Sequence, residues 1–227
     1  MTTLFQQGGW MLGVALVLGV VDWVAVARRS RQLEYVFKPA TLVAVIVGAG
    51  LLTRGPHDAR LALWFLPGLC FSLAGDVFLM LPGDRFFLPG LLSFFAAHVF
   101  YIIGLNPAWP PLPALAVLVV VGAAGAALYS RVSASLRAKG RREMLIPTGA
   151  YAAILSLMLF SAWATLFRPG WPAAGRLAIV VGATLFFASD SMLAWDRFVE
   201  KSRVLHVLVI VTYHLAQIAL AAAIALS

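Results

Sequence analysis

Eight apolar stretches of about 20 residues constrain this chain more than any other feature. They cover residues 9–27, 36–53, 61–81, 86–104, 112–130, 143–166, 174–195 and 204–226. About 20 apolar residues are enough for a helix to cross the roughly 30 Å hydrocarbon core of a membrane. Strands of outer-membrane barrels alternate polar and apolar residues instead, whereas these stretches are continuous. The sequence therefore predicts an all-α, multi-pass integral membrane protein, a bundle of eight transmembrane helices.

The composition agrees with a chain that lies in lipid. Of the 227 residues, 62% are hydrophobic and 11% are charged, and the mean hydropathy is +0.94. Soluble domains have about 45–50% apolar and about 25% charged residues. Because the segments between the stretches are short, we expect one transmembrane domain over residues 1–227. No Lys or Arg precedes Arg28, so the first stretch lacks the basic region of a cleaved signal peptide and is expected to stay.

The net charge of +8 suggests nucleic-acid binding, but the positions of the basic residues argue against it. If the N-terminus lies outside the cytoplasm, 13 of the 17 Lys and Arg fall on the cytoplasmic side, within 28–38, 82–85, 131–142 and 196–203. Such an excess of Lys and Arg is typical of cytoplasmic loops, where it also attracts anionic lipid. We therefore expect both termini to lie away from the cytoplasm, and we expect no nucleic-acid partner. The membrane is expected to be a bacterial-type inner membrane.

Two aspartates lie inside apolar stretches at matching depth. Asp76 occurs in FSLAGDVFLML at 71–81, and Asp190 occurs in FFASDSMLAW at 186–195. A charged carboxylate in hydrocarbon costs about 2.5–3.5 kcal/mol, so such a residue normally faces the bundle interior or a wet cavity. Asp76 lies six residues before Pro82 and Asp190 lies six residues before Asp196, just beyond their stretches, which is about 9 Å at 1.5 Å per residue. We expect both to face one cavity near the cytoplasmic leaflet, and the alternative is that each anchors a neighbouring helix.

The two aspartate motifs also indicate an internal repeat. AGDVFL at 74–79 aligns with ASDSML at 188–193, and each motif is followed by a helix that carries a histidine and a tyrosine. Internal duplication is common among membrane folds, so we predict a parallel repeat of four plus four helices. Asp22 lacks this motif, and we expect its carboxylate to pair with the arginines that follow its helix.

Further polar residues are candidates to line the cavity and position water. They are Ser72, His98, Tyr101, Ser189, Tyr213, His214 and Gln217, with ordinary packing as the alternative for each. We expect Ser72 and Ser189 to hydrogen-bond beside the aspartates rather than act as nucleophiles, because neither lies in a G-x-S-x-G context. Lys38 is a candidate partner for a phosphate or a carboxylate, and its alternative role is that of a flanking lysine at a helix end.

Five ordered motifs resemble those of the YhhN family, whose characterised members are lysoplasmalogenases. The motifs are FKP at 37–39, FSLAGDVFLM at 71–80, FFAAHVFY at 94–101, FFASDSMLA at 186–194 and YHLAQ at 213–217. The resemblance implies hydrolysis of the sn-1 vinyl-ether bond of a lysoplasmalogen, a lysophospholipid held in the bilayer. The products are a fatty aldehyde and glycerophosphoethanolamine or glycerophosphocholine. No cofactor and no protein partner are implied.

Cleavage of an enol ether needs an acid and an anion. Proton transfer to the β-carbon makes an oxocarbenium ion, which water captures as a hemiacetal. Glycoside hydrolysis passes through a similar cation and uses a pair of carboxyl groups. Asp76 and Asp190 are therefore the candidate catalytic residues, and the sequence leaves open which one is the acid.

Two other functions fit parts of the pattern. A metal-dependent hydrolase would use Asp76, Asp190 and either His98 or His214 as ligands, but the spacing of the histidines gives little support. A small-solute or proton-coupled transporter would fit the repeat and the intramembrane carboxylates. Separately, the GxxxG at 9–13 would allow a homodimer.

Overall fold

A computed structural model describes residues 2–53 and 59–227, and the regular structure in these ranges is helical. Its main helices are α1 (Thr2–Ala27), α2 (Arg31–Leu52), α3 (Ala59–Met80), α4 (Phe87–Leu105), α5 (Leu115–Ala138), α6 (Leu145–Ala164), α7 (Ala173–Ala194) and α8 (Arg203–Leu226). Short turns of 3-10 helix precede or follow several of them, and the π-helical turn η5 (Trp195–Val199) continues α7. Eight helical segments among the described residues are long and apolar enough to cross a membrane, which confirms the predicted all-α, multi-pass fold.

Most helix boundaries lie within three residues of the predicted ones, with three exceptions. α1 begins at Thr2 rather than 9, α2 begins at Arg31 rather than 36, and α5 ends at Ala138 rather than 130. Arg, Lys, Gln and Glu are good helix formers, so a helix continues through them after the apolar stretch has ended. α5 stops only before Gly140, whose φ of +72° is a left-handed conformation that glycine adopts without strain.

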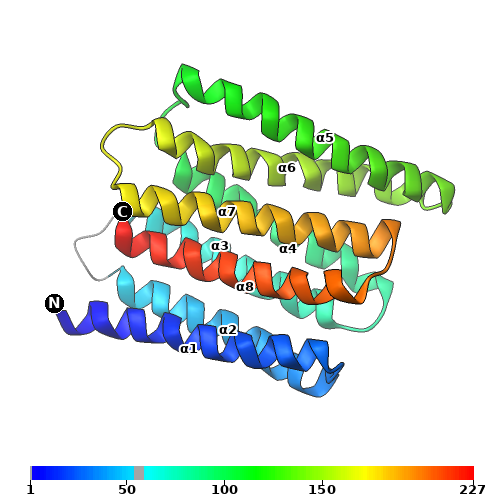
Figure 1. Ribbon diagram of the computed structural model, residues 1–227, viewed down its shortest axis with the longest axis horizontal. Coiled ribbons are helices and arrows are strands. Elements are labelled where there is room, and N and C mark those ends of the chain that lie inside the picture. Colours follow the sequence, from blue (N-terminus) through cyan, green and yellow to red (C-terminus); the bar gives the residue numbers. More distant parts are fainter. Residues whose placement is uncertain (1, 54–58) are drawn as a thin grey trace.

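The helices form antiparallel hairpins packed side by side (Figure 1). Successive pairs contact each other, namely α1 with α2, α3 with α4, α5 with α6, and α7 with α8. α8 also contacts α1, α2 and α3, and α6 joins α4 to α7. α5 lies at the edge of the bundle, where Val119 and Val120 are about 70% exposed. α8 therefore sits at the centre of one half of the bundle and α6 at the centre of the other.

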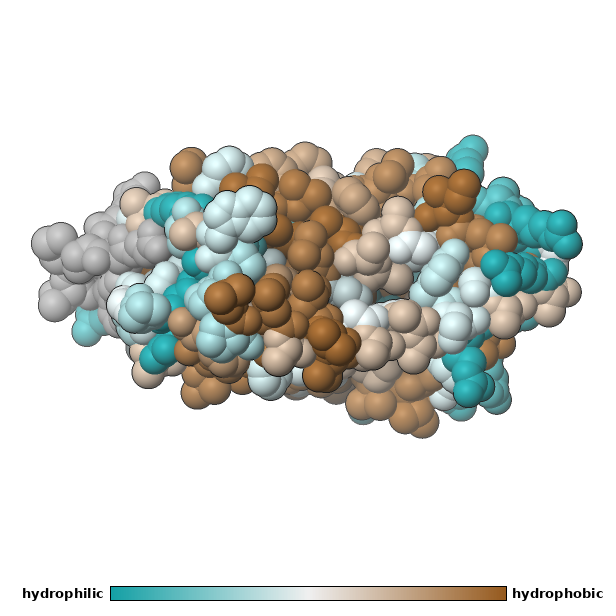
Figure 2. Space-filling model, turned by 90° about the horizontal axis from the view of Figure 1, so that it is seen from above, coloured by the Kyte–Doolittle hydropathy of each residue, from teal (hydrophilic) through white to brown (hydrophobic). Residues whose placement is uncertain are grey.

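The two ends of the bundle differ in charge. α1 begins and α8 ends at one end, whereas the connections 28–30, 81–86, 139–144 and 195–202 lie at the other (Figure 1). Hydrophobic residues cover the middle of the face seen in Figure 2, and hydrophilic residues gather densely at the end with these connections. We call this end the basic end. It carries Arg28, Arg85, Arg141, Arg197 and Lys201. The orientation of the basic end toward the cytoplasm stays a prediction.

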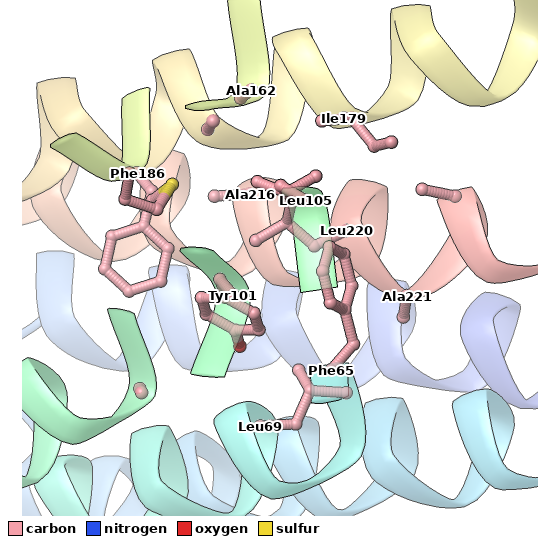
Figure 3. Close-up of a cluster of buried hydrophobic side chains, with 14 of the residues drawn as sticks. Phe65, Leu69, Tyr101, Leu105, Ala162, Ile179, Phe186, Ala216, Leu220 and Ala221 are labelled. Carbon is pink, nitrogen blue, oxygen red and sulfur yellow. The ribbon is translucent and has the colours of Figure 1, made fainter. Parts of the chain in front are cut away.

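Figure 3 shows part of the bundle core, where labelled side chains of α3, α4, α6, α7 and α8 lie close together. Phe65 of α3 packs edge-on against Tyr101 of α4, with 5.1 Å between ring centroids. Gly68 makes room for this tyrosine, because a Cβ at Gly68 would lie 2.6 Å from the Tyr101 ring. Gly75, next to Asp76, makes room for the ring of Phe94 in the same way. Both glycines allow α3 and α4 to approach closely, which is the usual reason for small residues between membrane helices.

Candidate active site

The structure places the two intramembrane aspartates in two separate clusters of buried polar side chains. In the first cluster, Asp76 of α3 meets Lys38 of α2 and Tyr213 of α8. The Lys38 Nζ lies 3.1 Å from Asp76 Oδ1, and the Tyr213 hydroxyl donates to Oδ2 at 2.7 Å. An ammonium and a phenol that both donate to one carboxyl group are the partners of a carboxylate anion. Lys38 therefore has the carboxylate partner that the sequence suggested as one alternative.

The second cluster gathers Asp190 of α7, Tyr151 of α6 and His98 of α4. The Tyr151 hydroxyl donates to Asp190 Oδ2. His98 Nε2 lies 3.6 Å from the same oxygen and 3.1 Å from the Tyr151 hydroxyl. His98 is fully buried, whereas Asp190 keeps 8% of its surface exposed. The carboxyl group of Asp190 is thus held by two neighbours while part of it remains accessible.

A layer of aromatic rings connects the two clusters. Phe186 packs against His98 with 4.8 Å between ring centroids and against Tyr213 with 5.6 Å. Phe94 completes the layer by packing edge-on against both Phe186 and Tyr213. The expectation that both aspartates face one cavity therefore finds no support in this geometry, since aromatic side chains fill the space between their clusters.

A largely apolar cavity opens beside Asp190 and not beside Asp76. Side chains of α4, α5, α6 and α7 line it, among them Leu91, Phe94, Leu128 and Leu155. The polar side chains in its wall come from Asp190, Tyr129, Tyr151, Thr148 and Arg197. Sites for small apolar ligands combine this kind of apolar lining with a few polar groups. Asp190 is therefore the carboxylate that a ligand in this cavity would meet.

A polar cleft at the basic end adjoins the cavity. The cleft is lined by Arg31, Glu34, Tyr35, Asp84 and His206, together with apolar residues. It shares three lining residues with the cavity, namely Leu79, Phe87 and Arg197. Cavity and cleft thus adjoin at these three side chains, between Asp190 and the surface of the basic end.

The family model for the YhhN family matches residues 33–224 of this chain. The chain belongs to the YhhN family. It is 34% identical over 152 residues to lysoplasmalogenase TMEM86B from Homo sapiens, a match that covers 66% of this chain and 58% of that protein. It is 31% identical over 179 residues to lysoplasmalogenase TMEM86A from Bos taurus, covering 77% of this chain and 68% of that protein. No solved structure matches the chain.

A bacterial relative matches over more of its length. The chain is 29% identical over 230 residues to a lysoplasmalogenase from Mycobacterium tuberculosis, covering 95% of this chain and 83% of that protein. The chain spans only about three fifths of the length of the human TMEM86B relative.

Three of the remaining predicted site residues of this YhhN protein, Tyr101, Gln217 and Ser189, bond to neighbouring helices. The Tyr101 hydroxyl donates to Gln217 Oε1 at 3.0 Å, which joins α4 to α8. Ser72 is fully buried close to Tyr101. Ser189 donates to the Val209 carbonyl at 2.9 Å, so its hydroxyl joins α7 to α8 beside Asp190. These four residues surround the two clusters without lining the cavity.

Asp22 and His214 lie on the side of the bundle where α1 packs against α2 and α8. The predicted pairing of Asp22 with the arginines after its helix is wrong, because Asp22 is fully buried and neither oxygen has a hydrogen-bond partner among the described residues. This face of α1 turns inward, toward α2 and α8. The Trp23 indole donates to His214 Nδ1 at 3.1 Å.

The ligand set of the metal alternative is not assembled in the YhhN fold. His98 lies beside Asp190, but His214 contacts Trp23, and Asp76 contacts Lys38. Within residues 2–53 and 59–227, no three His, Cys, Asp or Glu side chains come together as a metal site.

Tyr151 and Arg197 of this YhhN protein were not predicted from the sequence as site residues. Tyr151 lies in an apolar helix, where a tyrosine is most often a packing residue. The internal repeat could have identified it. When the two motifs are aligned so that Asp76 matches Asp190, Lys38 matches the position next to Tyr151. Lys38 contacts Asp76, and Tyr151 contacts Asp190. This correspondence is what a duplication would produce, and the repeat itself stays a prediction.

Proposed function

We propose that this chain hydrolyses the sn-1 vinyl-ether bond of lysoplasmalogens. The products would be a fatty aldehyde and glycerophosphoethanolamine or glycerophosphocholine. Membership of the YhhN family and the lysoplasmalogenase names of its relatives support this proposal. The observation that carries it is Asp190, a carboxyl group in the wall of a cavity that is otherwise largely apolar. An alkenyl chain suits the apolar lining, and an enol ether beside Asp190 meets the acid that its cleavage needs.

Asp190 acts as the general acid in this proposal. Its carboxylic acid transfers a proton to the β-carbon of the enol ether, which leaves an oxocarbenium ion and the Asp190 carboxylate side by side. The carboxylate stabilises the cation by charge and then takes a proton from the water that attacks the α-carbon. The resulting hemiacetal collapses to the aldehyde and the free sn-1 hydroxyl of glycerol. Asp190 is protonated again at the end of the cycle.

Tyr151 and His98 orient the Asp190 carboxyl group. Both reach Oδ2, so the proton that Asp190 delivers is carried by Oδ1 in this arrangement. His98 Nδ1 is buried and has no hydrogen-bond partner among the described residues. Buried polar atoms of this kind commonly bind water.

Asp76 is the second carboxylate of the proposed site. Lys38 and Tyr213 both donate to its oxygens and hold it in place. We therefore expect Asp76 to act mainly through Tyr213, whose ring packs against Phe94 in the cavity wall. Asp76 and Asp190 each lie four residues before the last residue of an α-helix, Met80 and Ala194, which is about 6 Å along the axis. A site at this depth below the basic end fits a substrate from the cytoplasmic leaflet.

The transporter alternative is less well supported. Transporters of the relevant kind often bind their substrates at interrupted helices near the midplane. α3 is continuous through Pro67, and α7 is continuous through Asp190.

Aldehyde release from a defined substrate tests the proposal. Purified protein in detergent is mixed with a lysoplasmalogen or with its saturated 1-O-alkyl analogue, and a coupled aldehyde dehydrogenase reports the product. We expect aldehyde from the vinyl ether alone, together with an equal amount of the glycerophospho product. Absence of aldehyde from the vinyl ether would overturn the proposed activity.

A further inference from the structure

Arg197 stands at the junction of the apolar cavity and the polar cleft. Its guanidinium lies over the Phe87 ring, 4.0 Å from the ring centroid, and its Nη2 lies 2.8 Å from Asp84 Oδ1. Arg197 Nε is buried and has no hydrogen-bond partner among the described residues. A buried donor without an acceptor is costly, so a ligand atom that accepts from it would bind favourably.

The cleft beyond Arg197 contains both signs of charge. Arg31 and His206 line it together with Arg197, and Glu34 and Asp84 line it with negative charge. Asp84 is paired with Arg197, whereas Glu34 has no ion pair within the described part of the chain. A ligand group that complements this cleft needs an anion toward Arg197 and a cation toward Glu34.

The spacing along the chain agrees with such a ligand. Asp190 and Arg197 are seven residues apart on the continuous helical segment from α7 into η5, which corresponds to roughly 10 Å along the axis. In a lysoplasmalogen, the glycerol backbone separates the phosphate from the enol ether. A phosphate at Arg197 therefore leaves the glycerol at the junction and directs the enol ether into the cavity toward Asp190.

We propose that the cleft binds the zwitterionic phosphate head group of the substrate, with the phosphate at Arg197 and the ammonium at Glu34. This inference rests on the proposed function for the identity of the substrate, and it assigns a head-group site that is distinct from Lys38. Lys38 is 7% exposed, pairs with Asp76 and does not line the cleft. Arginine suits a phosphate because its planar donors match two phosphate oxygens. Glu34 accepts hydrogen bonds from a primary ammonium, which a trimethylammonium cannot donate, so we expect ethanolamine to bind better than choline.

Binding of non-hydrolysable analogues tests the head-group site without requiring turnover. Three saturated ligands carry the same 1-O-alkyl chain on glycerol phosphoethanolamine, on glycerol phosphate, or on glycerol alone. Their affinities for purified full-length protein are measured by titration calorimetry in detergent. The variants are Arg197→Gln, Glu34→Gln and Asp84→Asn. Arg85→Gln is the matched control, because Arg85 also stacks on a neighbouring phenylalanine at the basic end but lines neither cavity nor cleft.

The expected results separate the parts of the site. Arg197→Gln weakens both phosphate ligands by tenfold or more and leaves alkylglycerol binding as in the unsubstituted protein, which also shows that the variant is folded. Glu34→Gln weakens only the phosphoethanolamine ligand, by several-fold. Asp84→Asn frees Arg197 and tightens the glycerol phosphate ligand. Arg85→Gln binds all three ligands as the unsubstituted protein does.

Two outcomes would overturn the head-group site. One is an Arg197→Gln protein that binds both phosphate ligands with unchanged affinity, and the other is an Asp84→Asn protein that binds glycerol phosphate no more tightly than before. Failure of the proposed activity gives a different result, namely the predicted affinity changes without aldehyde release from the vinyl-ether substrate. The two claims can therefore fail separately.

Discussion

Lys38 and Asp76 form an ion pair between α2 and α3, with 3.1 Å between Nζ and Oδ1 and with both side chains at most 9% exposed. Neither charge has water around it to compensate for the loss of its partner. Breaking a buried pair by removing one member typically costs about 3–5 kcal/mol, because it leaves an unpaired buried charge. We therefore expect the pair to stabilise the fold as well as to belong to the proposed site.

Removing one member of this pair should destabilise the protein, and removing both should not. We expect Lys38→Met and Asp76→Asn each to lose about 3–5 kcal/mol of stability and Lys38→Met/Asp76→Asn to recover most of that loss. Thermal unfolding of the purified variants in one detergent measures the effect. If the double variant were as unstable as the sum of the single variants, the two charges would not be coupled.

The Tyr151 hydroxyl should matter for turnover because it donates to Asp190. Tyr151→Phe removes this donor and should lower kcat roughly ten- to hundredfold with little change in KM, as expected for loss of a hydrogen bond to a charged group of about 1.5–3 kcal/mol. Tyr129→Phe is the control, since Tyr129 also lines the cavity but donates to the Leu145 carbonyl. Equal effects of the two substitutions would contradict the role given to Tyr151.

Gly75 should be intolerant of a larger side chain. A Cβ at this position would lie 2.6 Å from the Phe94 ring, so Gly75→Ala forces α3 and α4 apart or displaces Phe94 from the cavity wall. We expect a loss of about 1–3 kcal/mol in stability together with reduced activity. Gly122→Ala in α5 is the matched control, because nothing lies within 4 Å of its added Cβ. Similar melting temperatures for the two variants would show that the close packing at Gly75 is dispensable.

Filling the cavity from α5 should block the alkenyl chain. Leu128 lines the cavity from the peripheral helix, so Leu128→Trp should raise KM roughly tenfold for a long-chain substrate and less for a short-chain one, in line with ~1–3 kcal/mol for overpacking. Leu118→Trp, at a 41% exposed position of the same helix, should change neither value. If Leu128→Trp left KM unchanged for both chain lengths, the alkenyl chain would bind outside this cavity.

The sequence predicted the helices well because hydrophobicity alone decides which segments cross a membrane. The eight apolar stretches correspond to α1–α8, and errors arose only where helices continued into polar residues, as α5 does to Ala138. Asp76 and Asp190 stood out for the same reason, since a carboxyl group is rare in such a segment. Counting residues put both aspartates at equal depth, and in the structure each lies four residues, not six, before the end of its α-helix.

The arrangement across the bundle could not be predicted in the same way. Counting residues gives the position of a side chain along a helix axis but not the direction in which it points from that axis. It therefore put Asp76 and Asp190 at one level but could not predict the layer of Phe94 and Phe186 between their clusters. Tyr213 and Asp76 are 137 positions apart, and their contact depends on how α8 packs against α3. Arg197 resembles any other basic residue at a helix end until Phe87 and the cleft are placed around it.

The most direct measurement is the turnover of lysoplasmalogen by the Asp190→Asn variant. An asparagine keeps the shape of the side chain but cannot transfer a proton, and general acid catalysis typically contributes about 10²–10⁴-fold to a rate. We predict that kcat for aldehyde release falls by that factor while KM and the melting temperature change little. Glu143→Gln, the same exchange at an exposed position, should leave kcat unchanged. An Asp190→Asn protein that is folded and retains near wild-type kcat would contradict the assignment of Asp190 as the acid.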